Sequence, residues 1–148
     1  VPGFVVTPGC ACVRTSLRNT PDPDKRQRNE STTFEGVRSR YFESAVIDFD
    51  RLLTTLVSAL EQHEWLAGRE FSLADIAYAP YMTRLDHLQM SGMWDDRPAV
   101  ANWYGRLQSR EAYQIGLTRW FNPKYLTLVA EKGQAEWPYI AALLKSRG

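Results

Sequence analysis

The chain has 148 residues, a length typical of a single domain. Hydrophobic residues make up 44% of it, with five Trp, seven Tyr and six Phe, which is enough for a buried core. Eighteen basic and seventeen acidic side chains leave a net charge of +1, so nothing indicates binding to nucleic acid or to a membrane surface. No apolar run approaches the ~18 residues of a membrane span, and the first residues lack the pattern of a signal peptide.

The two cysteines bear on the cellular compartment of the protein. Cys10 and Cys12 are the two cysteines, and a disulfide between residues so close in sequence would be strained. A zinc site needs further ligands at a recognisable spacing, whereas His63 and His87 lie far away, so no metal is expected. We interpret the pair as reduced thiols of a cytoplasmic protein.

In chain order, the N-terminal part is the least typical of a helix. Val1 to Val13 holds two prolines and two glycines, and the prolines within Asn19 to Asp24 predict a break. From Phe34 to Leu60, apolar residues recur every three or four positions, which predicts one face of a long amphipathic helix. Gly36 and Ser39 predict a break or bend in its first turns.

The stretch from Trp65 to Ala77 predicts the entrance of another helix. Ser72 is typical of an N-cap, and the Asp75 carboxylate can return to the N–H of Ser72, which would close a capping box. Phe71 and Ile76 occupy the two positions of a hydrophobic staple. These four residues are therefore predicted to be structural, and Asp75 is not expected to be catalytic.

We expect this helix to run from Leu73 to about Met90, with a kink caused by Pro80. After a loop over Ser91 to Arg97, Pro98 suits the first position of the next helix.

The last part of the chain predicts further helices. Ser109 is placed to cap a short one, and Asn122-Pro123 predicts the start of another, which would stop at Gly133. A final helix is expected around Glu136 to Lys145. The whole pattern predicts an all-α fold, a single helical bundle.

The residues Trp65-Leu66-Ala67-Gly68, with Ser72, Ala74 and Asp75 after them, resemble the sixth helix of the glutathione S-transferase C-terminal domain, written W-L-x-G-x-x-x-[ST]-x-A-D. The later order of capped helix, loop and Pro98-x-Val100-x-x-Trp103 is similar too. The resemblance implies a glutathione S-transferase C-terminal-like helical domain over residues 26–148. The C-terminal part of the chain is similar to that of bacterial, β-etherase-like members of the family.

Residues 1–25 match this family poorly, and Gly9 to Arg18 is interpreted as a remnant of the domain's first helix. The thioredoxin-like domain that precedes the helical domain in this family is absent from the sequence. Since that domain supplies the glutathione site and the catalytic residue, we expect no catalytic residue in this chain and little or no activity from it alone.

The resemblance implies that the complete protein performs glutathione conjugation or thiolysis, with glutathione as cosubstrate and a hydrophobic electrophile as the other substrate. This chain would form much of the electrophile pocket and part of a homodimer interface. The candidate pocket residues are aromatic: Tyr41, Trp120, Phe121 and Tyr125. Three arginines are candidates to meet a substrate carboxylate: Arg14, Arg18 and Arg84.

Alternatives stay open. The four aromatic residues are also compatible with ordinary packing between helices, and the arginines with plain solvation. The same fold is used as a non-catalytic protein-interaction module, and a standalone helical protein with an apolar-ligand site is a third hypothesis. Fold class alone does not decide among them.

Overall fold

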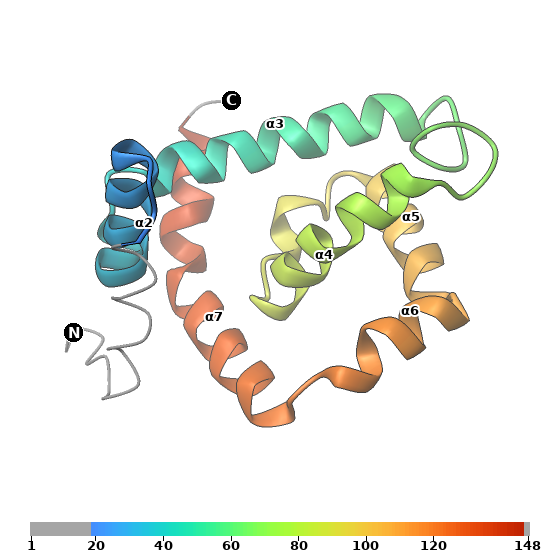
Figure 1. Ribbon diagram of the computed structural model, residues 1–148. Helices are drawn as coiled ribbons and strands as arrows, with labels where there is room; N and C mark the ends of the chain where they lie inside the picture. Colours follow the sequence, from blue (N-terminus) through green and yellow to red (C-terminus); the bar gives the residue numbers. More distant parts are fainter. Residues whose placement is uncertain (1–18, 147–148) are drawn as a thin grey trace. The chain divides into compact units, whose positions relative to one another are not determined.

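The computed structural model describes residues 19–146. In this part of the chain every regular element is a helix, and an isolated bridge joins Trp65 to Gly68 (Figure 1). The expected all-α fold class is confirmed. The predictions for Cys10 and Cys12, for a helix remnant before Asn19, and for Arg14 and Arg18 fall outside the described residues.

The chain divides into two units, residues 1–47 and 48–148. The first holds helix α2 (Pro23–Glu35), the short 3-10 helix η1 (Gly36–Arg38) and the first turns of α3 (Phe42–Leu60). Asp22 caps α2, since its Oδ1 accepts hydrogen bonds from the N–H groups of Asp24 and Lys25 at 2.9 and 3.1 Å.

The predicted break within Phe34 to Leu60 is confirmed. Helix α2 ends at Glu35, and α3 begins at Phe42. The separation starts at Gly36, whose φ of 59° is a left-handed conformation that glycine adopts without a steric penalty.

The second unit holds the rest of α3 and the helices that follow it (Figure 1). These are α4 (Leu73–His87), η2 (Ser91–Met93), α5 (Pro98–Ser109), α6 (Glu111–Gly116), η3 (Thr118–Trp120) and α7 (Pro123–Lys145). Helix α4 contacts both α5 and α7. The largest fully buried side chains of the described residues are Trp103, Leu53, Ile140, Val100 and Asp75.

The entrance of α4 contains the capping box. The Ser72 hydroxyl accepts from the N–H of Ala74 at 3.2 Å, and Asp75 Oδ2 accepts from the N–H of Ser72 at 2.8 Å. Phe71 packs edge-on against Trp65, with 5.2 Å between ring centroids, while Ile76 is 52% exposed. The pairing of Phe71 with Ile76 in a staple stays a prediction.

Two local expectations about helix ends are corrected. Helix α4 ends at His87 rather than near Met90, and Gln89 takes a left-handed φ of 57° just beyond it. Ser109 does not cap α6. It is the last residue of α5, and its hydroxyl donates to the carbonyl of Arg106 at 2.8 Å.

The two helices expected after Asn122 are one helix, α7. Asn122 caps it and Pro123 occupies its first turn, as predicted, but the helix continues through Gly133. Gly133 is needed for close packing, because a Cβ there would lie 1.8 Å from the carbonyl oxygen of Leu88. A glycine that permits such an approach looks, in sequence, like one that ends a helix.

None of the helices formed by residues 19–146 combines the length and apolar character that would let it cross a membrane.

Candidate ligand-binding site

Three of the four predicted substrate-binding residues lie where η3 leads into α7. Trp120 is the last residue of η3, Phe121 follows it, and Tyr125 lies in the first turn of α7. The start of α7 is fixed by Asn122, whose side-chain oxygen accepts from the N–H groups of Lys124 and Tyr125 at 3.0 and 3.4 Å. Trp120 is 78% exposed and Tyr125 48% exposed, so both rings are open to a ligand.

Two residues of α4 lie against these aromatic side chains. The His87 and Phe121 rings meet edge to face, with 4.5 Å between centroids. Arg84 Nη1 donates to the Tyr125 hydroxyl at 3.0 Å, and its guanidinium lies 5.6 Å from the centre of the Tyr125 ring. These contacts join Arg84 and His87 of α4 to Tyr125 and Phe121. Together with Trp120, which precedes Phe121 in the chain, we call these residues the aromatic–arginine surface.

Arg84 and His87 differ in charge. Arg84 is exposed, and no ion pair joins it to any carboxylate among residues 19–146. Burial lowers the pKa of His87, the negative charge of Asp86 opposes this effect, and the positive charge of Arg84 partly offsets that of Asp86. The imidazole is therefore neutral near pH 7, and Arg84 supplies the positive charge.

Sequence reasoning named Arg84 only as one of several arginines and gave His87 no role. The available signal was their spacing, because residues three apart share one face of a helix. What sequence could not supply was the partner. The contact between Arg84 and Tyr125 joins residues 41 positions apart.

Tyr41, the fourth predicted residue, belongs to the first unit. Its hydroxyl accepts from Arg40 Nη2 at 2.5 Å, and the Arg40 guanidinium lies 4.7 Å from its ring centre. It lines a hollow of about 580 Å³ whose other walls are charged, among them Asp22 and Asp24. Such walls favour a polar ligand over an apolar electrophile.

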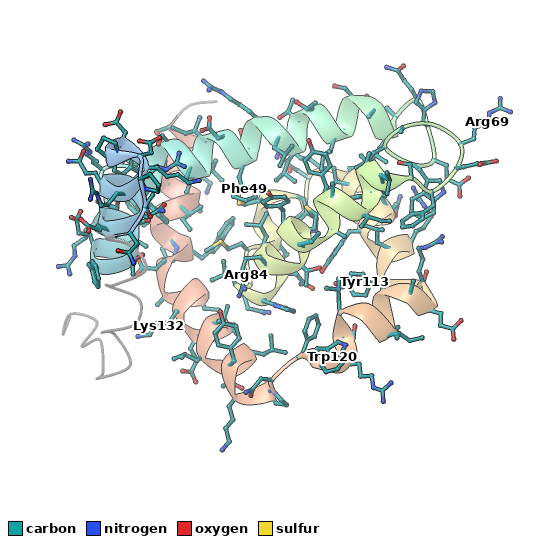
Figure 2. All side chains as sticks on the ribbon, in the orientation of Figure 1. Phe49, Arg69, Arg84, Tyr113, Trp120 and Lys132 are labelled. Carbon is teal, nitrogen blue, oxygen red and sulfur yellow. The ribbon has the colours of Figure 1, made fainter. Side chains whose placement is uncertain are left out.

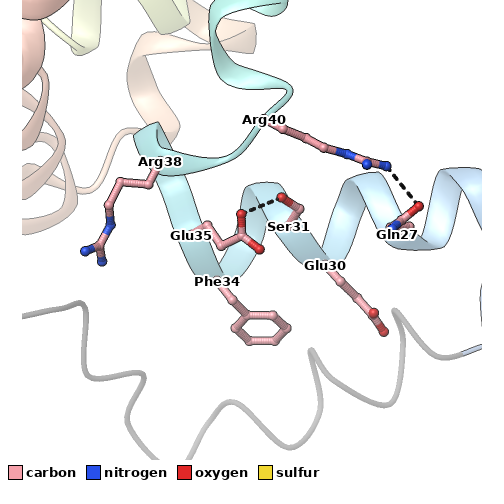
Figure 3. A pocket seen from close by; sticks show the side chains of 7 residues that line it. All are labelled: Gln27, Glu30, Ser31, Phe34, Glu35, Arg38 and Arg40. Atoms are coloured by element: carbon pink, nitrogen blue, oxygen red, sulfur yellow. Dashed lines mark hydrogen bonds between the residues drawn. The ribbon is translucent and has the colours of Figure 1, made fainter.

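A second hollow in the first unit, of about 410 Å³, is also polar (Figure 3). Arg40 Nη2 donates to Gln27 Oε1 at 3.0 Å across it, and the Ser31 hydroxyl donates to Glu35 at 2.8 Å. Its lining residues are Gln27, Glu30, Ser31, Phe34, Glu35, Arg38 and Arg40.

A third hollow, of about 450 Å³, lies in the second unit near the C-terminal end of α7. It combines Trp137 with charged groups, and the Arg97 guanidinium in its wall is bound to Asp50 at 2.6 Å. Lys145 and Asp96 also line this hollow, so its walls are largely charged.

Asp75 is fully occupied by structural hydrogen bonds. Its Oδ1 accepts from Leu66 N–H at 3.0 Å and from Trp103 Nε1 at 2.8 Å, while Oδ2 accepts from the N–H and hydroxyl of Ser72. Burial alone would raise the pKa of Asp75, but these hydrogen bonds outweigh it and hold the pKa below its usual range. The carboxylate has no lone pair left for a reaction. Residues 19–146 also contain no group of three His, Cys, Asp or Glu side chains placed to hold a metal ion.

Curated relatives resemble this chain over part of their length. Similar proteins include the glutathione S-transferase TCHQD of Arabidopsis thaliana, 35% identical over 82 residues, which are 53% of this chain and 31% of that protein. FtsZ-localized protein A of Caulobacter vibrioides is 39% identical over 64 residues, 43% of this chain and 28% of that protein. Glutathione S-transferase GstB of Escherichia coli (strain K12) is 35% identical over 63 residues, 43% of this chain and 29% of that protein.

This chain therefore spans less than one third of the length of each of these relatives. No solved structure matches it significantly. The family described as the C-terminal domain of glutathione S-transferase matches residues 32–106, half of the chain and the part that contains the capping box. The chain belongs to this family, the all-helical C-terminal domains of glutathione S-transferases.

Proposed function

We propose that this chain is the helical part of a glutathione S-transferase-like enzyme, and that it binds the hydrophobic electrophile through the aromatic–arginine surface. The observation that carries the proposal is the exposure of Trp120 and Tyr125, at 78% and 48%, beside Phe121 in a chain of this family. Large aromatic side chains are usually buried, and exposed ones grouped together are typical of binding sites.

The chemistry expected of the complete protein is glutathione conjugation or thiolysis. Thiol chemistry of this kind needs a group that stabilises the glutathione thiolate. We propose that a thioredoxin-like domain supplies it and the glutathione site, and that the helical domain covers residues 26–148. Two of the relatives above carry the name glutathione S-transferase, which supports glutathione as cosubstrate.

We further propose that the complete protein is a cytoplasmic homodimer. The support is the exposure of apolar side chains on α4, where Leu73 is 81% exposed, Ile76 52% and Tyr81 53%. Exposed apolar side chains favour burial against another protein surface.

A non-catalytic interaction module is the second candidate. It is favoured by the likeness to a protein whose name states that it is FtsZ-localized. A module of this kind would use its exposed apolar residues to hold another protein, and its aromatic side chains would have no small-molecule ligand.

Binding of an uncharged aromatic probe to the 148-residue chain separates these candidates. We expect naphthalene-2-carboxamide to bind in calorimetric titrations and to lose most of its affinity in Trp120→Ala and Tyr125→Ala. Leu73→Ala removes a similarly exposed apolar side chain at the start of α4 and should leave binding unchanged. Absence of binding, or equal loss in all three variants, would contradict the proposed site and favour the interaction module.

A further inference from the structure

The exposed guanidinium of Arg84 has unused capacity to bind an anion. An arginine side chain offers five N–H donors. One of them is used, by the neutral hydroxyl of Tyr125 at 3.0 Å, and no carboxylate among residues 19–146 forms an ion pair with the group. Because its charge is not neutralised by a neighbouring side chain, Arg84 can form charge-assisted hydrogen bonds with a ligand.

The stretch that holds the aromatic side chains carries few carboxylates. Residues 112–130 contain Arg119 and Lys124 and no acidic residue, and Glu111 and Glu131 flank this stretch. The acidic residue near Arg84 on α4 is Asp86, and its carboxylate forms no ion pair with Arg84. Its Oδ2 accepts from the Tyr104 hydroxyl at 3.0 Å and from Gln108 Nε2 at 3.4 Å.

Flat apolar surface lies beside the cation. Figure 2 shows Arg84 extending from α4 and Trp120 in the segment between α6 and α7. Tyr125 contacts Arg84 directly through both its hydroxyl and its ring, and Leu128, one helical turn further along α7, is 47% exposed. A planar ring can stack on aromatic side chains here while a charged substituent reaches the guanidinium.

We propose that the aromatic–arginine surface selects aromatic carboxylates, with the ring of the ligand on Trp120 and Tyr125 and its carboxylate paired with Arg84. This inference rests on the proposed function, because it names the substrate class of the same surface. A carboxylate matches the planar fork of a guanidinium and accepts two parallel hydrogen bonds from it. An uncharged ring of the same shape binds more weakly, since it leaves the positive charge unpaired.

The test compares two probes of one shape on the 148-residue chain, naphthalene-2-carboxylate and naphthalene-2-carboxamide, by isothermal titration calorimetry. We expect the carboxylate to bind about two- to fivefold more tightly at low salt, the strength typical of an exposed ion pair. The preference should shrink as salt is added, because both groups are exposed and their attraction is screened.

Two variants test whether Arg84 is the source of the preference for the carboxylate. Arg84→Gln removes the charge at an exposed helical position and should abolish the preference for the carboxylate, so that the two probes bind with equal affinity. Arg69→Gln makes the same change at an exposed arginine between α3 and α4, remote from Arg84 in Figure 2, and should leave the preference intact. Circular dichroism of each variant checks that the fold is retained.

Failure of this inference is distinguishable from failure of the proposed function. Equal affinity for the two probes, or a preference that survives in Arg84→Gln, would overturn the carboxylate selectivity and leave an apolar site in place. If neither probe binds the unaltered chain, both the selectivity and the proposed electrophile site are overturned.

Discussion

The indole Nε1 of Trp103 donates a hydrogen bond of 2.8 Å to Asp75 Oδ1, joining α5 to the first turn of α4. Both side chains are fully buried. The same carboxylate accepts from Leu66 and from Ser72, so one aspartate holds the turn before α4, the start of α4 and a core tryptophan together. The residues that identify the family therefore hold these parts of the fold together.

Asp75→Asn should destabilise the chain substantially. The amide that replaces the carboxylate presents a donor to groups that are themselves donors, so buried hydrogen bonds are lost, at a cost of about 2–4 kcal/mol in the free energy of unfolding. Urea denaturation followed by circular dichroism measures this. The conservative change Asp50→Asn, at a partly exposed ion pair with Arg97, serves as a control and should cost about 0–1 kcal/mol. Equal midpoints for Asp75→Asn and the unaltered chain would contradict the structural role.

The low pKa of Asp75 predicts how stability depends on pH. Because the pKa in the folded chain lies below that of an ordinary aspartate, about 3.9, the unfolded chain takes up a proton first as the pH falls. The stability that Asp75 contributes is fully present above that value and is lost as the pH drops through the range below it. Urea midpoints measured between about pH 5 and pH 2 should therefore fall more steeply for the unaltered chain than for Asp75→Asn. Parallel profiles would contradict the assignment.

Gly133 is predicted to be intolerant of a side chain. In Gly133→Ala the new Cβ would meet the backbone of Leu88, and since neither backbone can yield without moving a helix, we expect a loss of about 1–3 kcal/mol. Gly105→Ala is the matched control within α5, where a Cβ meets nothing within 4 Å, and it should stabilise the chain by about 0.5–1 kcal/mol. Thermal unfolding of the two variants compares them directly. A stabilised Gly133→Ala would show that α4 and α7 do not pack as closely as described.

The parts of the fold that sequence predicted well are set by short-range chemistry. Ser72 with Asp75, Asn122 with Pro123, and Gly36 each act within a few residues, so their effect is readable from local spacing. Gly133 was misread because its role depends on Leu88, a residue on a different element. The contact of Arg84 with Tyr125 escaped prediction for the same reason, since two distant helices must pack before the pair exists. The aromatic candidates were named through resemblance to a family, and their role as a binding surface stays a prediction.

The central claim is that the exposed aromatic residues before and within α7 bind an apolar aromatic ligand. The most direct test is the response of the tryptophan indole N–H signals in NMR spectra. Naphthalene-2-carboxamide should shift the Trp120 signal, assigned by its disappearance in Trp120→Phe. The signal of Trp103, buried and bonded to Asp75, should stay in place. An unmoved Trp120 signal at saturating probe, or shifts confined to the other tryptophans, would contradict the claim.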